Sequence, residues 1–263
     1  MTKQLLESFD NGVATLTMNR PQDRNAMTAA MMNAMAEAVV RLAKDPKVRL
    51  LVLTGSGNTF CVGGDVKGFV DDTGAIAAEH DSVELLRERT RISELLYTMP
   101  KPTLAIIPGA CAGAGLSLAL ACDMRMVVDT AKITTAFTRV GTSGDFGGAW
   151  FLTHMVGAAK ARELYFTADV ILGKQAYQLG LANRLVTIET LEQESKKYIE
   201  SLANLPTIAI GYIKKNINMA QQGSLAQVLD IEAAHMVLST MTDDHKSAAH
   251  AFLAKKPPIF EGC

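Results

Sequence analysis

The pattern of apolar residues changes its period partway along this chain of 263 residues. Up to about residue 200, short apolar runs typical of strands alternate with helical spacing and glycine-rich turns. The strand-like runs are 13–18, 48–54, 102–107 and 125–128. From Thr190 onward only helical patterns remain, at about 190–203, 206–221, 224–239 and 244–254. Strands and helices in alternation predict an α/β fold, followed by a helical segment for oligomerisation or for covering a site.

Local residue types refine this assignment. Thr28 is a typical N-cap residue, so we expect a helix from there to about residue 43. Helical spacing recurs at 82–97, and a glycine turn at 113–122 opens a helix of small residues. The polar stretch 71–82 has no clear period and predicts an irregular loop.

No fixed-period repeat or low-complexity linker divides the chain. The change of pattern near Pro206 is the best candidate boundary. We therefore predict a core of residues 1–204, which holds the ligand site, and a helical C-terminal segment of residues 205–263.

Composition excludes several classes of function. The net charge of −1 provides no basic surplus for a nucleic-acid partner. Apolar runs are too short to span a membrane, and the N-terminus has no signal-peptide pattern. The scattered cysteines have no metal-ligand spacing, so we expect no metal site, and they fit reduced thiols in a cytoplasmic protein. They are Cys61, Cys111, Cys122 and Cys263.

Asp145 is the first candidate for catalysis. It stands among glycines and apolar residues, with almost nothing nearby to neutralise its charge. Burial of a carboxylate raises its pKa, which suits a group that accepts and returns a proton near neutral pH. The alternative is that Asp145 caps the helix that follows Gly147 and Gly148, and an N-cap role would lower its pKa instead.

Two glycine clusters follow predicted strands, at 60–65 and 109–115. The second cluster opens a helix, whose first N–H groups are unpaired and favour an anion. Two such N–H groups from separate loops would form an oxyanion hole, although either cluster alone fits a tight turn. A dinucleotide site is disfavoured because Leu118 replaces the third glycine of the fingerprint, and no P-loop sequence occurs.

These segments together resemble the enoyl-CoA hydratase/isomerase (crotonase) superfamily over essentially the full chain. The matching segments are NRP at 19–21, NAM at 25–27, FCVGGD at 60–65, KPTLA at 101–105, GACAGAGLSLA at 109–119, ACD at 121–123 and GGAW at 147–150. The resemblance implies a spiral core of ββα units and a trimer or dimer of trimers. It also implies an acyl-CoA substrate whose thioester oxygen is held by two backbone N–H groups, with no separate cofactor.

The resemblance also suggests roles for individual residues. It places the two oxyanion N–H groups on Gly64 and Ala114. The adenine and phosphate end of CoA is expected along Val62, Asp65, Val66 and Lys67, although Lys67 also fits a solvated surface lysine. The acyl pocket is expected around Phe137, Phe146 and Trp150, whereas His154 is expected to be structural.

Hydratases of this superfamily use two glutamates to place a water molecule, and here those positions are Ser117 and Phe137. Asp145 instead resembles the acid of ring-epoxide and β,γ-enoyl-CoA isomerases of phenylacetate degradation. We therefore expect an acyl-CoA isomerase with Asp145 as its single acid/base. Three alternatives stay open: hydration of an unusual enoyl-CoA, aryl-CoA dehalogenation with Asp145 as nucleophile and His80 as helper, and a non-catalytic acyl-CoA-binding or RNA-binding homologue.

Overall fold

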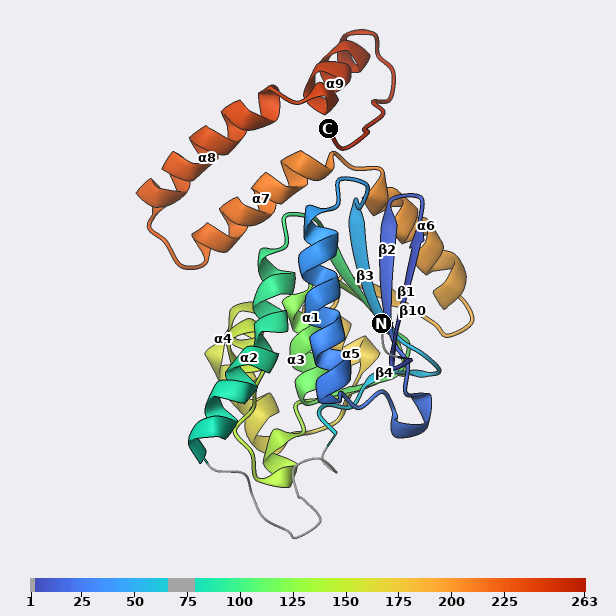
Figure 1. Ribbon diagram of the computed structural model, residues 1–263, viewed down its shortest axis with the longest axis vertical. Helices are drawn as coiled ribbons and strands as arrows, with labels where there is room; N and C mark the ends of the chain where they lie inside the picture. Colours follow the sequence, from blue (N-terminus) through green and yellow to red (C-terminus); the bar gives the residue numbers. More distant parts are fainter. Residues whose placement is uncertain (1–2, 66–78) are drawn as a thin grey trace.

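Two β-sheets form the centre of the protein (Figure 1). The computed structural model describes residues 3–65 and 79–263. The larger sheet contains, in spatial order, β1 (Leu5–Asp10), β2 (Val13–Met18), β3 (Leu50–Gly55), β5 (Thr103–Ile107), β7 (Met124–Val128) and β10 (Arg184–Val186). The smaller sheet contains β4 (Thr59–Cys61), β6 (Ala110–Ala112), β8 (Lys132–Thr134) and β9 (Ile171–Leu172). Neighbouring strands are parallel except for the β1–β2 and β8–β9 pairs.

Three consecutive ββα units link the two sheets. In each unit a strand of the larger sheet is followed by a strand of the smaller sheet and then by a helix. The helices are α2 (Glu79–Thr98), α3 (Ala114–Ala121) and α4 (Gly148–Thr167). Because the two strands of a unit are separated by only two or three residues, each unit turns sharply from one sheet to the other. The chain thus advances as a spiral, and the glycine-rich segments lie where the second strand ends.

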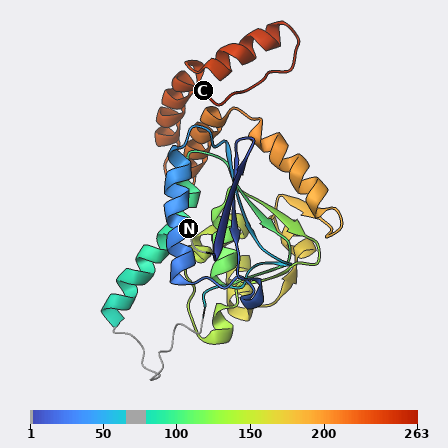
Figure 2. The ribbon, with the colours of Figure 1, turned by 45° about the vertical axis from the view of Figure 1, so that its right-hand side comes forward.

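Helices cover both faces of the larger sheet. Figure 2 shows α1 (Ala29–Lys44) and α6 (Leu191–Ala203) on opposite sides of it. The Thr28 side chain accepts a hydrogen bond from the Met31 N–H at 3.2 Å, which confirms the predicted N-cap of α1. Because both faces are covered, β3 and β5 are almost wholly buried, and their sequences are continuous apolar runs.

The C-terminal helices form an arm that leaves the core (Figure 1). After the short α5 (Gly173–Gln178) and α6, the arm consists of α7 (Thr207–Ala220), α8 (Leu225–Thr240) and α9 (Asp243–Leu253). The buried Lys214 ammonium anchors α7 to the core through Asp123 Oδ2 at 2.8 Å and the Leu96 carbonyl at 2.9 Å. Arg49 holds the last residues by donating to the Phe260 carbonyl at 2.6 Å.

The predicted α/β core with a helical C-terminal segment is confirmed. The irregular loop predicted at 71–82 is wrong at its end, because α2 begins at Glu79; residues 71–78 lie outside the described part of the chain. The C-terminal half of α2 buries Ile92 and Leu96. The boundary after residue 204 falls in the α6–α7 turn, and the division into two units stays a prediction.

Several short elements have no counterpart among the predictions, since strands of two or three residues are too short to show a period. The sequence analysis placed a helix after Gly147 and Gly148 but gave it no extent; α4 runs from Gly148 to Thr167 and is interrupted at Gly157, which has φ 76°. Among the helices in residues 3–65 and 79–263, none is long and apolar enough to cross a membrane.

Replacing Asn25 by Ala should destabilise the turn that supports the start of β4. Asn25 is fully buried; its Oδ1 accepts from the Arg20 N–H at 2.9 Å, and its Nδ2 donates to the Ser56 and Thr59 carbonyls at 3.0 and 2.9 Å. Loss of these bonds is expected to lower the free energy of unfolding by about 2–4 kcal/mol in urea titrations. Asn11→Ala is the matched control, because Asn11 also has positive φ but is exposed. Equal losses in both variants would show that backbone conformation, and not the buried amide, is responsible.

Candidate active site

A parallel bridge to Met27 sets the direction of the Gly64 amide. The Met27 N–H donates to the Gly63 carbonyl at 2.8 Å, and the Asp65 N–H donates to the Met27 carbonyl at 3.0 Å. In a parallel pair these bonds come from the residues on either side of the bridged one, so the Gly64 N–H points away from Met27. It is therefore free to face a ligand.

The second amide belongs to Ala114, the first residue of α3. Its N–H lies in the first helical turn, where no intrahelical acceptor exists and the helix end is positive. Gly113 precedes it with φ 54° and ψ −129°, a conformation that favours glycine. No backbone hydrogen bond within residues 3–65 and 79–263 takes up the N–H of Gly64 or Ala114.

The two turns lie against each other. A Cβ atom placed on Gly63 would lie 3.6 Å from the Ala114 nitrogen, and one placed on Gly113 would lie 3.9 Å from Gly63 Cα. Helix α3 can approach this closely because Gly115 has no side chain; a Cβ there would be 2.4 Å from the Cys61 carbonyl oxygen. We call the paired turns Gly63–Gly64 and Gly113–Ala114 the amide cradle, since each presents an unused N–H group.

Asp145 stands in a turn with unusual backbone geometry. Gly144, Phe146 and Gly147 all have positive φ, at 100°, 52° and 74°. A phenylalanine in the left-handed region is strained by about 1–3 kcal/mol, and such strain is often found at functional sites. Helix α4 starts at Gly148 with Gly147 as its N-cap, and no side chain caps it. The alternative role of Asp145 as a side-chain N-cap is therefore wrong.

The Asp145 carboxylate is half-buried, and no cationic side chain within residues 3–65 and 79–263 forms an ion pair with it. Its Oδ1 is buried and makes no hydrogen bond to the described part of the chain. Burial raises its pKa from the ordinary 3.8 to about 6. The elevated pKa expected from the sequence is thus confirmed, and it allows proton exchange near neutral pH.

One aromatic ring lies between the Asp145 turn and the amide cradle. A Cβ on Gly113 would lie 3.9 Å from the Phe137 ring, and one on Gly144 would lie 3.4 Å from the same ring. Phe137 also stacks on Tyr165, with ring centroids 6.0 Å apart and planes within 4°. The Asp145 turn and the cradle therefore contact the same ring, Phe137.

Tyr165 is a half-buried neighbour that the sequence analysis missed, because it lies near the far end of α4 and is distant from Asp145 in sequence. Gly148 has no room for a side chain, since a Cβ there would be 2.2 Å from Ser117 Oγ and 2.5 Å from the Tyr165 hydroxyl. Burial, with a smaller contribution from the Asp145 charge, raises the pKa of Tyr165 to about 12. Its hydroxyl therefore stays protonated, and together with Ser117 it fills the space behind the Asp145 turn.

The residues predicted to bind the nucleotide end of CoA lie at and after the end of β4. Val62 is half-buried at the end of β4, and the Asp65 carboxylate forms an ion pair with Arg20 at 2.9 Å. Val66 and Lys67 lie outside the described residues. In the described part of the chain, no three His, Cys, Asp or Glu side chains gather in a way that could hold a metal ion.

Phe146 is buried, whereas Trp150 belongs to an aromatic cluster behind the Asp145 turn. The Trp150 ring meets Tyr97 and Phe151 edge-on, each at a centroid distance of 5.1 Å. His154 packs on Trp150 at 4.1 Å, and its Nδ1 lies 2.8 Å from the Trp150 carbonyl oxygen. His154 thus has the structural contacts expected from the sequence.

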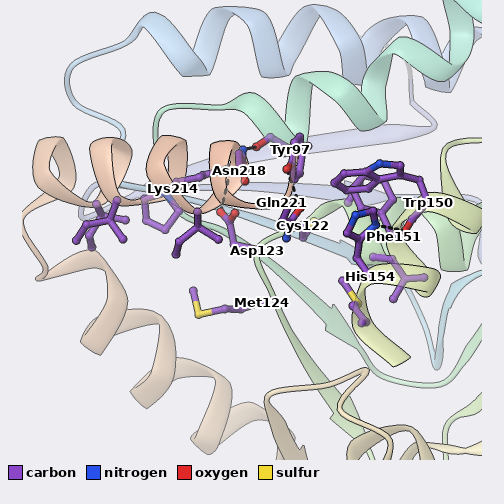
Figure 3. Close-up of a pocket in the computed structure, with 17 residues that line it drawn as sticks. Tyr97, Cys122, Asp123, Met124, Trp150, Phe151, His154, Lys214, Asn218 and Gln221 are labelled. Carbon is purple, nitrogen blue, oxygen red and sulfur yellow. Dashed lines mark hydrogen bonds and ion pairs between the residues drawn. The ribbon is translucent and has the colours of Figure 1, made fainter. Parts of the chain in front are cut away.

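Two cavities adjoin this cluster. The α7 cavity, about 340 Å³, lies between α4 and α7 and contains the Asp123–Lys214 ion pair (Figure 3). The α2 cavity, about 590 Å³, lies between α2 and the start of α4, and Gly147 of the Asp145 turn is part of its wall. Tyr97 lines both cavities; its hydroxyl donates to Gln221 Oε1 of the α7–α8 turn at 2.9 Å, and its carbonyl accepts from Asn218 of α7 at 3.0 Å.

Asp145→Asn should make the folded protein more stable at neutral pH. Because the folded-state pKa of Asp145 is raised to about 6, the folded protein holds this proton more tightly than the unfolded chain. The associated stability is present below about pH 4 and is lost as the pH rises through 6, whereas asparagine stays uncharged. We expect a higher urea midpoint for the variant at pH 7–8 and a vanishing difference near pH 4. The exposed Asp169→Asn is the control, and a variant less stable than wild type at pH 8 would contradict the assignment.

Comparisons with known proteins agree with this geometry. The Enoyl-CoA hydratase/isomerase family profile matches residues 8–263. The chain is 35% identical to 1,2-epoxyphenylacetyl-CoA isomerase of Escherichia coli K12 over the full length of both, and 32% identical to crotonyl-CoA hydratase of Syntrophomonas wolfei over 94% of each. The crystal structure of an enoyl-CoA hydratase from Polaromonas sp. JS666 superposes with a TM-score of 0.91 at 29% identity, over 97% of this chain and 99% of that one. The chain therefore belongs to the enoyl-CoA hydratase/isomerase (crotonase) family.

Proposed function

We propose that this enzyme is an acyl-CoA isomerase that shifts a double bond, or opens a ring epoxide, in a CoA thioester. The observation that carries the proposal is a half-buried carboxylate whose Oδ1 has no hydrogen-bond partner in the described part of the chain, in a turn that shares the Phe137 ring with two N–H groups that no described backbone acceptor uses. A thioester supplies the oxygen that such N–H groups bind and the acidic carbon that such a carboxylate deprotonates.

In this proposal the thioester oxygen accepts hydrogen bonds from the N–H groups of Gly64 and Ala114. The Asp145 carboxylate removes a proton from the carbon chain, and the electron pair moves into the carbonyl as a dienolate. The amide cradle stabilises the negative oxygen, and one such donor is typically worth about 10²–10³ in rate. Protonated Asp145 then returns the proton at the other end of the conjugated system, so the reaction consumes no net proton.

The rest of the substrate is assigned to residues named by the sequence analysis. We propose that the nucleotide end of CoA lies along Val62, Asp65, Val66 and Lys67. Because Arg20 neutralises the Asp65 carboxylate, this residue contributes its backbone and not a free charge. No cofactor beyond the CoA of the substrate is part of the proposal. The acyl pocket is assigned to Phe137, Phe146 and Trp150.

Hydration of an unusual enoyl-CoA is the second candidate, because the relatives include a crotonyl-CoA hydratase that matches nearly the full chain. The residues that would hold the water favour isomerisation instead. Ser117 offers a hydroxyl that faces Tyr165 and Gly148, and Phe137 offers an apolar ring stacked on Tyr165. Neither side chain can act as a general base at neutral pH.

The other two hypotheses have less support. Aryl-CoA dehalogenation would need His80 as a helper, and the side chain of His80 lies outside the described residues. A non-catalytic homologue leaves the raised pKa of Asp145 and its unpartnered oxygen without a role.

Asp145→Asn tests the proposal directly. We expect it to bind a β,γ-enoyl-CoA but to lower kcat/KM for isomerisation by about 10²–10⁴, and to stop exchange of α- and γ-protons in deuterated water. In wild type, kcat/KM should rise with pH through about 6, since the carboxylate is the reactive form. Asp169→Asn, which alters an exposed carboxylate, is the control. Normal proton exchange by the Asp145 variant would remove this residue from the mechanism.

We also propose that the protein assembles in the cytoplasm as a homotrimer or a dimer of trimers through the C-terminal arm, residues 205–263. The arm exposes apolar side chains that water disfavours; they are Leu225, Leu229, Met236, Val237, Phe252 and Leu253. The free cysteines fit a reducing compartment. Native mass spectrometry should show three or six copies, and Leu229→Lys with Val237→Lys should shift the mass toward the monomer. A monomeric wild-type protein at micromolar concentration would contradict this assembly.

A further inference from the structure

The peptide group between Gly113 and Ala114, which is part of the amide cradle, is held at its carbonyl oxygen. The Gly113 carbonyl accepts from the Ser117 N–H at 3.1 Å and from the Ser117 hydroxyl at 3.4 Å. Because a peptide group is planar, its C=O and N–H bonds point in opposite directions. The bonds that fix the Gly113 carbonyl therefore also fix the direction of the Ala114 N–H.

Ser117 has a second polar neighbour, the hydroxyl of Tyr165. The two side chains are hydrogen-bonded, although Ser117 lies in α3 and Tyr165 lies near the end of α4. Both hydroxyls reach the same point of the α4 backbone, since a Cβ atom on Gly148 would lie 2.2 Å from Ser117 Oγ and 2.5 Å from the Tyr165 oxygen. The missing side chain of Gly148 thus provides the space in which they meet.

The direction of these hydrogen bonds follows from the number of protons. A serine hydroxyl has one proton, and Ser117 donates it to the Gly113 carbonyl. In the second bond the Tyr165 hydroxyl is therefore the donor and Ser117 Oγ the acceptor. Tyr165 keeps its proton because burial, with a smaller contribution from the Asp145 charge, raises its pKa to about 12. Since hydrogen bonds in a chain polarise one another, this chain also makes the Ala114 N–H a stronger donor.

The Tyr165 ring is enclosed in a way that keeps its hydroxyl at Ser117. The ring stacks on Phe137 with centroids 6.0 Å apart and planes within 4°. On the side of the Asp145 turn, its Cε1 would lie 3.0 Å from a Cβ atom on Gly144. A ring packed against both neighbours has little freedom to withdraw its hydroxyl from Ser117.

We propose that Tyr165 and Ser117 are positioning residues, which orient and polarise the Ala114 N–H through a hydrogen-bond chain that ends at the Gly113 carbonyl. Neither residue is assigned a contact with the substrate; both act through the peptide group of the cradle. The inference rests on the proposed function, because it takes a thioester oxygen as the ligand of the cradle.

The vibrational frequency of a bound thioester carbonyl tests this assignment. The probe is octanoyl-CoA labelled with ¹³C at the thioester carbon, observed by infrared difference spectroscopy. In wild type, hydrogen bonds from the cradle should lower the carbonyl frequency relative to the free ligand. Tyr165→Phe, which keeps the ring, and Ser117→Ala should each move it back toward the value of the free ligand. Because one of the two donors is weakened and not removed, kcat for a β,γ-enoyl-CoA should fall about three- to ten-fold, with a smaller change in the Kd of octanoyl-CoA.

The double variant distinguishes one chain from two independent effects. If both hydroxyls act through the Gly113 carbonyl, Tyr165→Phe should have little further effect on kcat once Ser117 is replaced by alanine. The pH dependence of kcat/KM should keep its midpoint near 6 in both single variants, because the chain ends at the cradle and not at Asp145.

Thr135→Val is the matched control, since it removes a buried hydroxyl that donates to the Leu164 carbonyl of α4 at 2.8 Å. We expect it to lower Tm without moving the carbonyl frequency. An unchanged frequency in Tyr165→Phe or in Ser117→Ala, additive effects on kcat, or a shifted pH midpoint would overturn the inference while the proposed function stands. A wild-type protein that does not bind octanoyl-CoA, or binds it without lowering the carbonyl frequency, would overturn the proposed function as well.

Discussion

The close contact between the first turn of α3 and the end of β4 governs the rest of the site. The carbonyl oxygen of Cys61 occupies the space that a side chain at position 115 would need. Only glycine at that position therefore lets the two backbones meet. Cys61 itself is buried, and burial raises the pKa of its thiol to about 12, so it acts as packing and not as a nucleophile. The contact brings together two N–H groups that belong to different ββα units, and neither has a backbone acceptor within residues 3–65 and 79–263. The sheets and helices around them are the support that keeps two unsatisfied donors side by side.

The Asp145 turn contains two energetically unfavourable features. One oxygen of its carboxylate is buried although no cation in the described residues compensates it, and the neighbouring Phe146 adopts a left-handed conformation. These costs are tolerated because the turn is enclosed by Phe137, Tyr165 and the first residues of α4, which leave few alternatives. A raised pKa and a strained backbone at one residue are features expected where an acid must change its protonation state during turnover.

The sequence analysis predicted the features that leave a local pattern. The N-cap Thr28, the buried runs of β3 and β5, and the four C-terminal helices follow from period and residue type, and the isolation of Asp145 among glycines predicts its raised pKa. Contacts between residues that are distant in sequence could not be predicted from the sequence. Tyr165 reaches the site only because α4 runs past Ser117, and the Arg20–Asp65 ion pair joins two loops separated by β3. The short strands β4, β6 and β8 also escaped, because tertiary pairing and not periodicity defines them.

Tyr97 has a consequence for the geometry of the whole molecule. Its backbone and hydroxyl are held by α7 and the α7–α8 turn, while its ring packs against Trp150 in the first turn of α4. One side chain thus acts as a spacer between the protruding arm and the turn that carries the acid. Since side chains in packed interiors have little freedom to compress, any displacement of α7 relative to α4 must be accommodated at this ring. A movement of the C-terminal arm is therefore transmitted through Tyr97 to the start of α4, next to the turn that carries Asp145.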